Sequence, residues 1–300
     1  MELQKTSIES IFIKMNEKFF STEFARSSKF KWDFVNKIKD IDRWQHLSKN
    51  FEKYEQNLKC KKNVLKKIPR KIHQIWIGPK KIPKKYLDWG ITWKKNNPDW
   101  DYKLWTNEEI KDLDMYNRTI YDSSDNLGFK SDLVRYEILY QYGGIYIDTD
   151  FECLKKIPDK LRDYEFVSCI GFNYSPEILN GFIMATRQSK IIRELIFNLQ
   201  LPQDKKDPMT IIKLSGPLKL TELYFKNYKN KSNNYMILPS NYCYPYPSFL
   251  INSAVKEFNE IVSESFAIHH WEMSWMKGNY IKRFINKLIY IYTSIKNKQI

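Results

Sequence analysis

Strand-like and helix-like arrangements of apolar residues follow one another through the middle of the chain. Short β-prone runs closed by turn-forming residues occur at residues 71–78 and 101–106, with a helical pattern between them. A second helical pattern, at 131–144, ends in paired glycines and leads into another β-prone run at 145–150. Alternating strands and helices pack as a parallel or mixed sheet covered by helices, so the pattern predicts an α/β fold.

Strand and helix candidates continue beyond this region, and the two ends of the chain look different. We expect further strands at 164–172, 180–186 and 235–240 and a helix at 189–200. The predicted organisation is a helical N-terminal extension at 1–67, a central α/β domain at 68–276 and a basic amphipathic C-terminal helix at 277–300.

The composition is that of a globular and strongly basic protein. Of its 300 residues 42% are hydrophobic, and the formal net charge is +15. Such a charge favours a polyanionic partner, which could be a nucleic acid, an anionic membrane or a phosphorylated ligand. No helix-turn-helix, zinc-finger or RNA-binding motif accompanies the charge, so we expect no nucleic-acid partner.

Cysteine usage and the chain ends bear on location. The four cysteines form no Cys-x-x-Cys pair, which disfavours a zinc cluster or a disulfide framework. The first twenty residues lack the apolar core and cleavage site of a secretory signal, and no apolar run is long enough to span a bilayer. We therefore expect a cytoplasmic protein. The apolar stripe from Ile281 to Ile295, beside lysines and an arginine, fits either packing on the core or peripheral contact with the inner face of the cytoplasmic membrane.

The most informative short stretch is GGIYIDTD, residues 143–150. Alternation along a strand would place Asp148 and Asp150 on one face, at the carboxyl end of a buried strand. Paired carboxylates are hard ligands that suit Mg²⁺ or Mn²⁺, which in turn hold a diphosphate. Acid and base catalysis across one glycosidic bond needs carboxyl groups on opposite sides, which this spacing does not provide. The alternative is a solvated loop or a helix cap.

The preceding helix adds a charged pair. Asp132 and Arg135 are three residues apart and share a helix face that leads directly to the acidic strand end. An aspartate, an arginine and a metal brought together are typical of a nucleotide-sugar site. An ordinary intrahelical salt bridge is the alternative.

Five stretches in order resemble the motifs of glycosyltransferase family 32, which carries an Asp-x-Asp sugar-binding region. The family includes yeast initiating mannosyltransferases, bacterial capsule and lipopolysaccharide enzymes and, more distantly, the clostridial glucosylating toxins. The resemblance covers residues 68 to 276 and rests on the stretches IPRKIHQIWIG, NPDWDYKLW, KSDLVRYEILYQYGGIYIDTDFECLKKI, SGPLKLT and AIHHWEMSW. It implies that the central domain is a GT-A catalytic domain with a mixed sheet, a nucleotide-sugar donor, a Mn²⁺ or Mg²⁺ ion and retention at the anomeric carbon.

The resemblance also implies roles for donor-site residues. Trp76 would stack on the base, although a core aromatic is an equal alternative at that position. Asp132 and Arg135 would hold the sugar and the diphosphate, and Tyr146 would line the donor site. Asp148 would face the ribose and sugar.

Metal, lid and acceptor residues are implied in the same way. Asp150 would ligate the metal with Asp148 beside it, and His270 would be the second protein ligand. His269 is the alternative, because neighbours on an extended segment face opposite ways. Ser274 and Trp275 would close over the diphosphate. Asn180 would border the acceptor, with Asn173 as a weaker candidate.

The expected function is therefore transfer of a hexose from a nucleotide-sugar, preferably UDP-linked, to a glycan or lipid-linked glycan acceptor. The bacterial relatives favour surface polysaccharide synthesis, as in capsule, O-antigen or lipooligosaccharide. Two alternatives stay open: an effector-like transferase that modifies a host protein, and a non-enzymatic basic module that binds nucleic acid or membrane.

Overall fold

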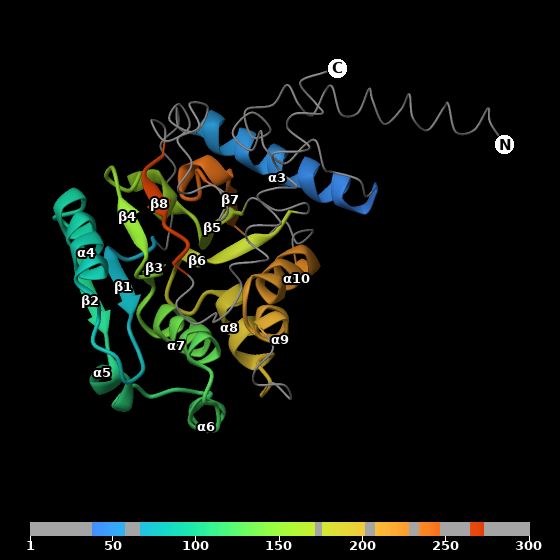
Figure 1. Ribbon diagram of the computed structural model, residues 1–300. Helices are drawn as coiled ribbons and strands as arrows, with labels where there is room; N and C mark the ends of the chain where they lie inside the picture. Colours follow the sequence, from blue (N-terminus) through green and yellow to red (C-terminus); the bar gives the residue numbers. More distant parts are fainter. Residues whose placement is uncertain are drawn as a thin grey trace, which may run out of the picture.

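The structure of the chain, a computed structural model, describes residues 38–57, 67–171, 176–201, 208–227, 234–246 and 265–272 (Figure 1). The predicted C-terminal helix at 277–300 lies outside the described residues. So do Ser274, Trp275 and Asn173. The domain boundaries expected near residues 67 and 276 stay predictions.

Among the described residues, six strands form the main sheet, in the order β2-β1-β3-β6-β5-β7. The strands are β1 (Lys71–Ile75), β2 (Asp101–Trp105), β3 (Gly144–Ile147), β5 (Phe166–Ile170), β6 (Ile178–Ala185) and β7 (Tyr235–Leu238). β6 runs antiparallel to both of its neighbours, whereas the other paired strands are parallel. The mixed sheet confirms the α/β fold class.

The central strands are buried along their whole length. Every residue of β3, β5, β6 and β7 is buried, which explains why these segments read as continuous apolar runs instead of alternating ones. Because β1 and β3 are parallel, their carboxyl ends lie at one edge of the sheet. β6 runs the other way, so the beginning of β6 reaches the same edge. Ligands of open α/β sheets bind at such an edge.

Helices cover both faces of the sheet. α7 (Leu127–Tyr142) ends beside His73 of β1, whose Nε2 lies 2.9 Å from the carbonyl oxygen of Gly143. The next residue, Gln74, points to the opposite face. There it lies under Gly90 of α4 (Lys84–Asn96), where an added Cβ atom would be 3.2 Å from Oε1 of Gln74. Figure 1 shows α4 and α7 on either side of β1.

A second group of helices covers the other half of the sheet. α10 (Pro217–Asn227) packs on β6, on α9 (Pro208–Leu214) and on α8 (Lys190–Phe197). Two short helices, α5 (Asn107–Lys111) and α6 (Arg118–Asp122), connect β2 to α7. The predictions of α4, α7 and α8 are confirmed, whereas α9 and α10 were not predicted as helices.

The described part of the N-terminal extension packs on the sheet domain. α3 (Ile38–Asn57) contacts β7 and buries Trp44, Leu47 and Phe51, each at most 1% exposed. Asn50 Nδ2 donates to the carbonyl oxygen of Tyr235 at 3.0 Å. This helix therefore contributes to the core.

A small two-stranded sheet joins the acidic turn to the C-terminal part of the chain. β4 (Phe151–Cys153) pairs antiparallel with β8 (Ala267–His269), and Phe151 lies opposite His269. The strand expected at 145–150 is shorter than predicted, because β3 ends at Ile147 and the chain turns before β4 begins. The aspartates therefore lie in the turn that links the two sheets.

Two of the cysteines meet in the core. The Sγ atoms of Cys169 on β5 and Cys243 are 2.8 Å apart, both side chains are fully buried, and both are free thiols. Cys243 follows the short 3-10 helix η3 (Ser240–Tyr242). Spacing along the chain gave no sign of this contact, which the fold creates.

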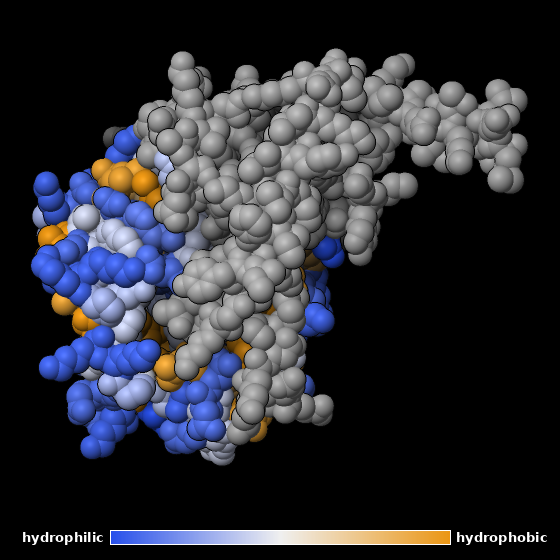
Figure 2. Space-filling model, in the orientation of Figure 1, coloured by the Kyte–Doolittle hydropathy of each residue, from blue (hydrophilic) through white to orange (hydrophobic). Residues whose placement is uncertain are grey.

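The described surface is largely hydrophilic on the face shown in Figure 2, and hydrophobic side chains gather there only in small patches. None of the described helices has the length and apolar character needed to cross a membrane.

Candidate active site

Local structure at both ends of α7 sets the position of its charged residues. The Asn126 side chain caps the helix by accepting from the main-chain N–H of Phe129 at 3.0 Å. The helix ends at Gly143, with φ of 62°, and Gly144 follows with φ of 104°, a region that favours glycine. A Cβ atom on Gly144 would lie 2.5 Å from the carbonyl oxygen of Lys71. The paired glycines thus end the helix and let β3 enter the sheet beside β1.

Asp132 lies in a buried cage of donors. Its Oδ1 accepts from Asn180 Nδ2 at 2.9 Å and lies 3.2 Å from Nη2 of Arg135, while Oδ2 accepts from Ser215 Oγ at 2.6 Å. Burial raises the pKa of Asp132, and the positive charge of Arg135 opposes that shift. With both oxygens engaged and 5% of the residue exposed, Asp132 holds the network together.

Arg135 connects Asp132 to the acidic turn. Its Nη1 donates to the main-chain carbonyl oxygen of Asn180 at 2.5 Å, and its Nη2 lies 3.3 Å from Oδ1 of Asp148. The guanidinium carbon lies 4.4 Å from the centre of the Tyr146 ring. Most of the guanidinium N–H groups are thus used inside the protein. Arg135 therefore holds Asp148 in place, and direct contact with the donor, which the resemblance implied, stays a prediction.

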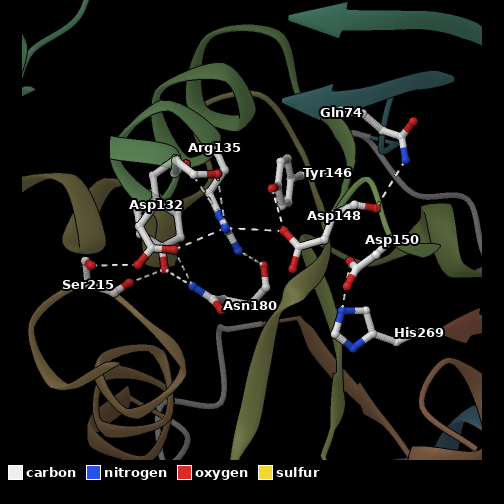
Figure 3. Close-up of polar contacts among 11 residues, drawn as sticks. Gln74, Asp132, Arg135, Tyr146, Asp148, Asp150, Asn180, Ser215 and His269 are labelled. Atoms are coloured by element: carbon white, nitrogen blue, oxygen red, sulfur yellow. Dashed lines mark hydrogen bonds and ion pairs between the residues drawn. The ribbon is translucent and has the colours of Figure 1, made fainter. Parts of the chain in front are cut away.

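Asp148 is held on several sides. Tyr146 Oη donates to its Oδ1 at 2.6 Å, and Gln74 Nε2 donates to its main-chain oxygen at 3.1 Å. Its main-chain N–H donates to the carbonyl oxygen of Gly181 at 2.8 Å. The Asp148 side chain is 29% exposed, whereas that of Arg135 is 6% exposed, so Asp148 is where the network reaches solvent. Figure 3 shows this row of contacts running from Ser215 through Arg135 to Asp148.

Asp150 and His269 form the other half of the site. Asp150 Oδ1 lies 3.0 Å from Nε2 of His269, and its Oδ2 accepts from the main-chain N–H of Glu272 at 2.9 Å. Burial acts to raise the pKa of Asp150, but the charge of His269 and hydrogen bonds from His269 and Glu272 outweigh burial and lower it. Figure 3 shows the imidazole directed at the carboxylate.

This group fits a divalent cation. Asp148, Asp150 and His269 offer ligand atoms that all lie within 4.8 Å of one another. Adjacent ligands at about 2.1 Å from an octahedral ion are about 3 Å apart, which matches the 3.0 Å between Asp150 Oδ1 and His269 Nε2. Two carboxylates and an imidazole are ligands that divalent cations use in proteins.

His270, the favoured second ligand, points elsewhere. Its Nε2 lies 3.1 Å from Oε2 of Glu152, and its ring stacks on Trp89 with centroids 4.2 Å apart. The register of β8, which places His269 opposite Phe151, turns the neighbouring histidine away from the aspartates. The structure therefore corrects this expectation and brings His269 to the acidic pair.

Two further residues named from the sequence have defined places. Trp76 follows β1 and is half-buried; its Nε1 donates to the carbonyl oxygen of Lys80 at 2.8 Å, and its ring lies 5.1 Å from that of Tyr86. Trp76 is thus absent from the fully buried core, and base stacking stays a prediction. Asn180 is buried and donates to Asp132, and its expected place beside the acceptor stays a prediction.

Sequence reasoning missed three residues that shape the site. Ser215 supports Asp132, Gln74 supports the main chain of Asp148, and Gly181 lies against the Asp148 carboxylate. Ser215 lies in the stretch SGPLKLT, and Gly181 lies in the strand expected at 180–186. Nothing in the local pattern of either residue indicated contact with an aspartate.

Comparisons with known proteins show which family the chain resembles. Residues 84–167 match the family described as "Glycosyltransferase sugar-binding region containing DXD motif". The uncharacterized glycosyltransferase L373 of Acanthamoeba polyphaga mimivirus is 30% identical over 189 residues, which cover 59% of this chain and 73% of that protein. Inositol phosphoceramide mannosyltransferase 1 of Schizosaccharomyces pombe is 30% identical over 188 residues, which cover 59% of this chain and 57% of that protein.

The chain spans about half the length of the first curated relatives it matches, at 57% and 45% of two Schizosaccharomyces pombe mannosyltransferases. Among solved structures, the ligand-free glycosyltransferase domain from the YGT toxin has a TM-score of 0.46 and 10% identity, covering 57% of this chain and 80% of that one.

The mixed sheet and the acidic turn at its edge define an α/β protein with a polar site at the carboxyl end of a central strand. The chain belongs to the family of glycosyltransferases whose sugar-binding region contains a DXD motif.

Proposed function

We propose that the protein transfers a hexose from a nucleotide-sugar donor to a glycan acceptor with the help of a divalent cation. The convergence of Asp148, Asp150 and His269 within 4.8 Å is the observation that carries the proposal. A cation held by these residues would offset the negative charge of the departing diphosphate. Mn²⁺ or Mg²⁺ fits the oxygen-rich donor set.

The protein's own residues prepare the site for the donor. A buried network of hydrogen bonds and ion pairs holds the carboxylate of Asp148 in place; its members are Arg135, Asp132 and Asn180. Asp148 faces solvent enough to accept hydrogen bonds from ribose or sugar hydroxyl groups. Preorganised polar groups of this kind lower the barrier because they need no rearrangement during the reaction.

The proposal extends to which sugar is transferred and to which kind of acceptor. The resemblance to bacterial enzymes favours a UDP-hexose and an acceptor in surface polysaccharide synthesis. Several relatives are named mannosyltransferases, and three of these are named for inositol phosphoceramide, which favours mannose and a lipid-linked acceptor. We propose a hexose donor and a glycan or lipid-linked glycan acceptor, and the donor screen below separates UDP-hexoses from GDP-mannose.

Slow donor hydrolysis is the direct test. UDP-glucose, UDP-galactose, UDP-N-acetylglucosamine and GDP-mannose are each incubated with the protein in Mn²⁺, in Mg²⁺ and after chelation. We expect release of one sugar, dependent on the cation and lost in Asp150→Asn. Asp159→Asn is the matched control, because Asp159 is an exposed partner of Arg70 and Arg162. Hydrolysis that survives both chelation and Asp150→Asn would contradict the proposed role of the cation.

A further inference from the structure

Tyr244 is a buried tyrosine directly beneath the acidic turn. It follows Cys243 and is 1% exposed. Its ring centre lies 5.2 Å from that of Phe151, 5.3 Å from His269 and 5.6 Å from Trp271. The side chain is therefore packed against the strands that carry the proposed cation ligand His269.

Two buried polar atoms at this place have no partner among the described residues. One is the hydroxyl oxygen of Tyr244, and the other is Nδ1 of His269. A buried donor or acceptor without a partner costs free energy, so such atoms in a folded protein call for an explanation. The two atoms belong to residues whose rings are in edge contact, so a single explanation should account for the missing partners of both.

The Tyr244 hydroxyl also lies close to Asp148. A Cβ atom placed on Gly181 would be 3.1 Å from the Tyr244 hydroxyl and 2.5 Å from Oδ2 of Asp148. The hydroxyl and the carboxylate oxygen thus border the same point above Gly181. Oδ1 of Asp148 is already engaged by Tyr146, whereas Oδ2 faces this point.

Binding of a cation changes what His269 requires. In the structure Nε2 of His269 lies 3.0 Å from Oδ1 of Asp150. If Nε2 becomes a metal ligand, the imidazole proton must lie on Nδ1. A metal-bound histidine nearly always donates that N–H to a neighbouring acceptor. A tyrosine hydroxyl can accept one hydrogen bond and donate another at the same time.

We propose that Tyr244 is a positioning residue of the cation site, whose hydroxyl accepts from Nδ1 of His269 and donates to the carboxylate of Asp148 when the cation is bound. The inference rests on the proposed function, because it requires a cation held by Asp148, Asp150 and His269. It gives a role to both atoms that lack a partner among the described residues. It also assigns a function to the segment after β7, which neither the motifs nor the spacing of the sequence had indicated.

Tyr244→Phe tests this with little change of shape, because it removes one oxygen atom. Mn²⁺ alone is titrated into the full chain, and free Mn²⁺ is followed by electron paramagnetic resonance. We expect the Kd for Mn²⁺ to rise about tenfold, as is usual when an outer partner of a metal ligand is lost. The thermal midpoint of the metal-free variant should stay the same or rise, because the part of the chain that the structure describes offers the Tyr244 hydroxyl no hydrogen bond to lose.

Tyr224→Phe is the matched control. Tyr224 is also 1% exposed, but its hydroxyl lies 3.2 Å from Nε2 of His46 and 3.5 Å from Nδ2 of Asn50, on α3. This variant should lower the thermal midpoint and leave the Kd for Mn²⁺ unchanged. The two variants should therefore show opposite patterns.

Each other outcome overturns a defined part of the inference. If wild type binds Mn²⁺ and Tyr244→Phe binds it equally well, the role of Tyr244 is wrong while the cation site stands. A lower thermal midpoint of metal-free Tyr244→Phe would show a structural partner for the hydroxyl and overturn the inference as well. No binding by wild type would overturn the cation site itself, and the role of Tyr244 with it.

Discussion

A side-chain carbon on Gly181 would lie 2.5 Å from Oδ2 of Asp148, a separation that Cβ atoms do not adopt. The same glycine accepts a main-chain hydrogen bond from Asp148 at 2.8 Å. β6 therefore approaches the acidic turn as closely as a backbone can, and only glycine leaves room for the carboxylate.

Gly181→Ala should displace the Asp148 carboxylate and lower kcat/KM for the donor by about a hundredfold, since misplacement of a site group by about 1 Å can have such an effect. Donor hydrolysis measures it. Gly171→Ala is the control, because its Cβ would also meet an atom at 2.5 Å, the Cδ1 of the Leu179 side chain. If the two variants had equal kcat/KM for the donor, the close approach of Gly181 to Asp148 would not matter for activity.

Ser215→Ala should lower activity through Asp132. The variant removes the 2.6 Å hydrogen bond to Oδ2 of Asp132, leaving a buried carboxylate with fewer donors, at a cost of about 1–3 kcal/mol of unfolding free energy. We expect the donor KM to rise and kcat to fall, with Ser215→Thr recovering part of both.

Ser168→Ala is the comparison for Ser215. Ser168 is also fully buried, but its hydroxyl bonds to main-chain oxygens of Leu179 and Phe182. It should lose stability and keep wild-type kinetics. If both serine variants behaved alike in the kinetic assay, Ser215 would be a packing residue.

Local patterns predicted the strand and helix order because each signal is carried by neighbouring residues. The paired glycines ended α7 as expected, and their positive φ values explain why glycine is needed there. The position of Asp148 at the end of β3 followed from the same signals.

Contacts between distant parts of the chain could not be predicted in this way. The choice between His269 and His270 depends on the register of β8 against β4, and a shift of one residue exchanges the two faces. Ser215 lies 83 residues from Asp132, and a serine before Gly216 and Pro217 reads as a turn. Only the packing of α10 on β6, with α9 against α10, brings it to the site.

The stability of the protein should fall as the pH decreases from about 6.5 to about 4, in part because of His73. Burial lowers the pKa of His73 from 6.5 to about 4, although its hydrogen bond to Gly143 opposes the shift. Trp105 Nε1 donates to Nδ1 at 3.1 Å, which fixes the neutral imidazole. As the pH falls, the unfolded chain takes up this proton first, so stability present above pH 6.5 is lost.

The loss from this residue amounts to about 3 kcal/mol at most. Thermal midpoints of wild type and His73→Gln between pH 4 and pH 7.5 measure it, and the variant should show the shallower dependence. His46→Gln is run in parallel, because burial also lowers the pKa of His46 to about 4. Parallel curves for wild type and His73→Gln would contradict the assignment.

Arg135→Lys should damage both the fold and the site, although it keeps the positive charge. The guanidinium bonds to Asn180 at 2.5 Å and reaches Asp132 and Asp148 at 3.2 and 3.3 Å. A lysine ammonium is a compact charge that cannot span these three acceptors. We expect a loss of about 1–3 kcal/mol of unfolding free energy, a higher donor KM and a lower kcat.

Arg162→Lys separates these effects. Arg162 forms an ion pair with Asp159 at the same three-residue spacing and 3.0 Å, but Asp159 is 55% exposed and lies outside the acidic site. The Arg162 side chain is itself 13% exposed, and its Nε donates to the carbonyl oxygen of Ile68 at 2.8 Å, so Arg162→Lys should also cost about 1–3 kcal/mol of unfolding free energy but leave the donor kinetics unchanged. Calorimetry measures the unfolding free energy of both variants, and donor kinetics measure their kcat and KM. If folded Arg135→Lys kept wild-type kcat and KM and lost only stability, Arg135 would be a structural ion pair with no role in placing Asp148.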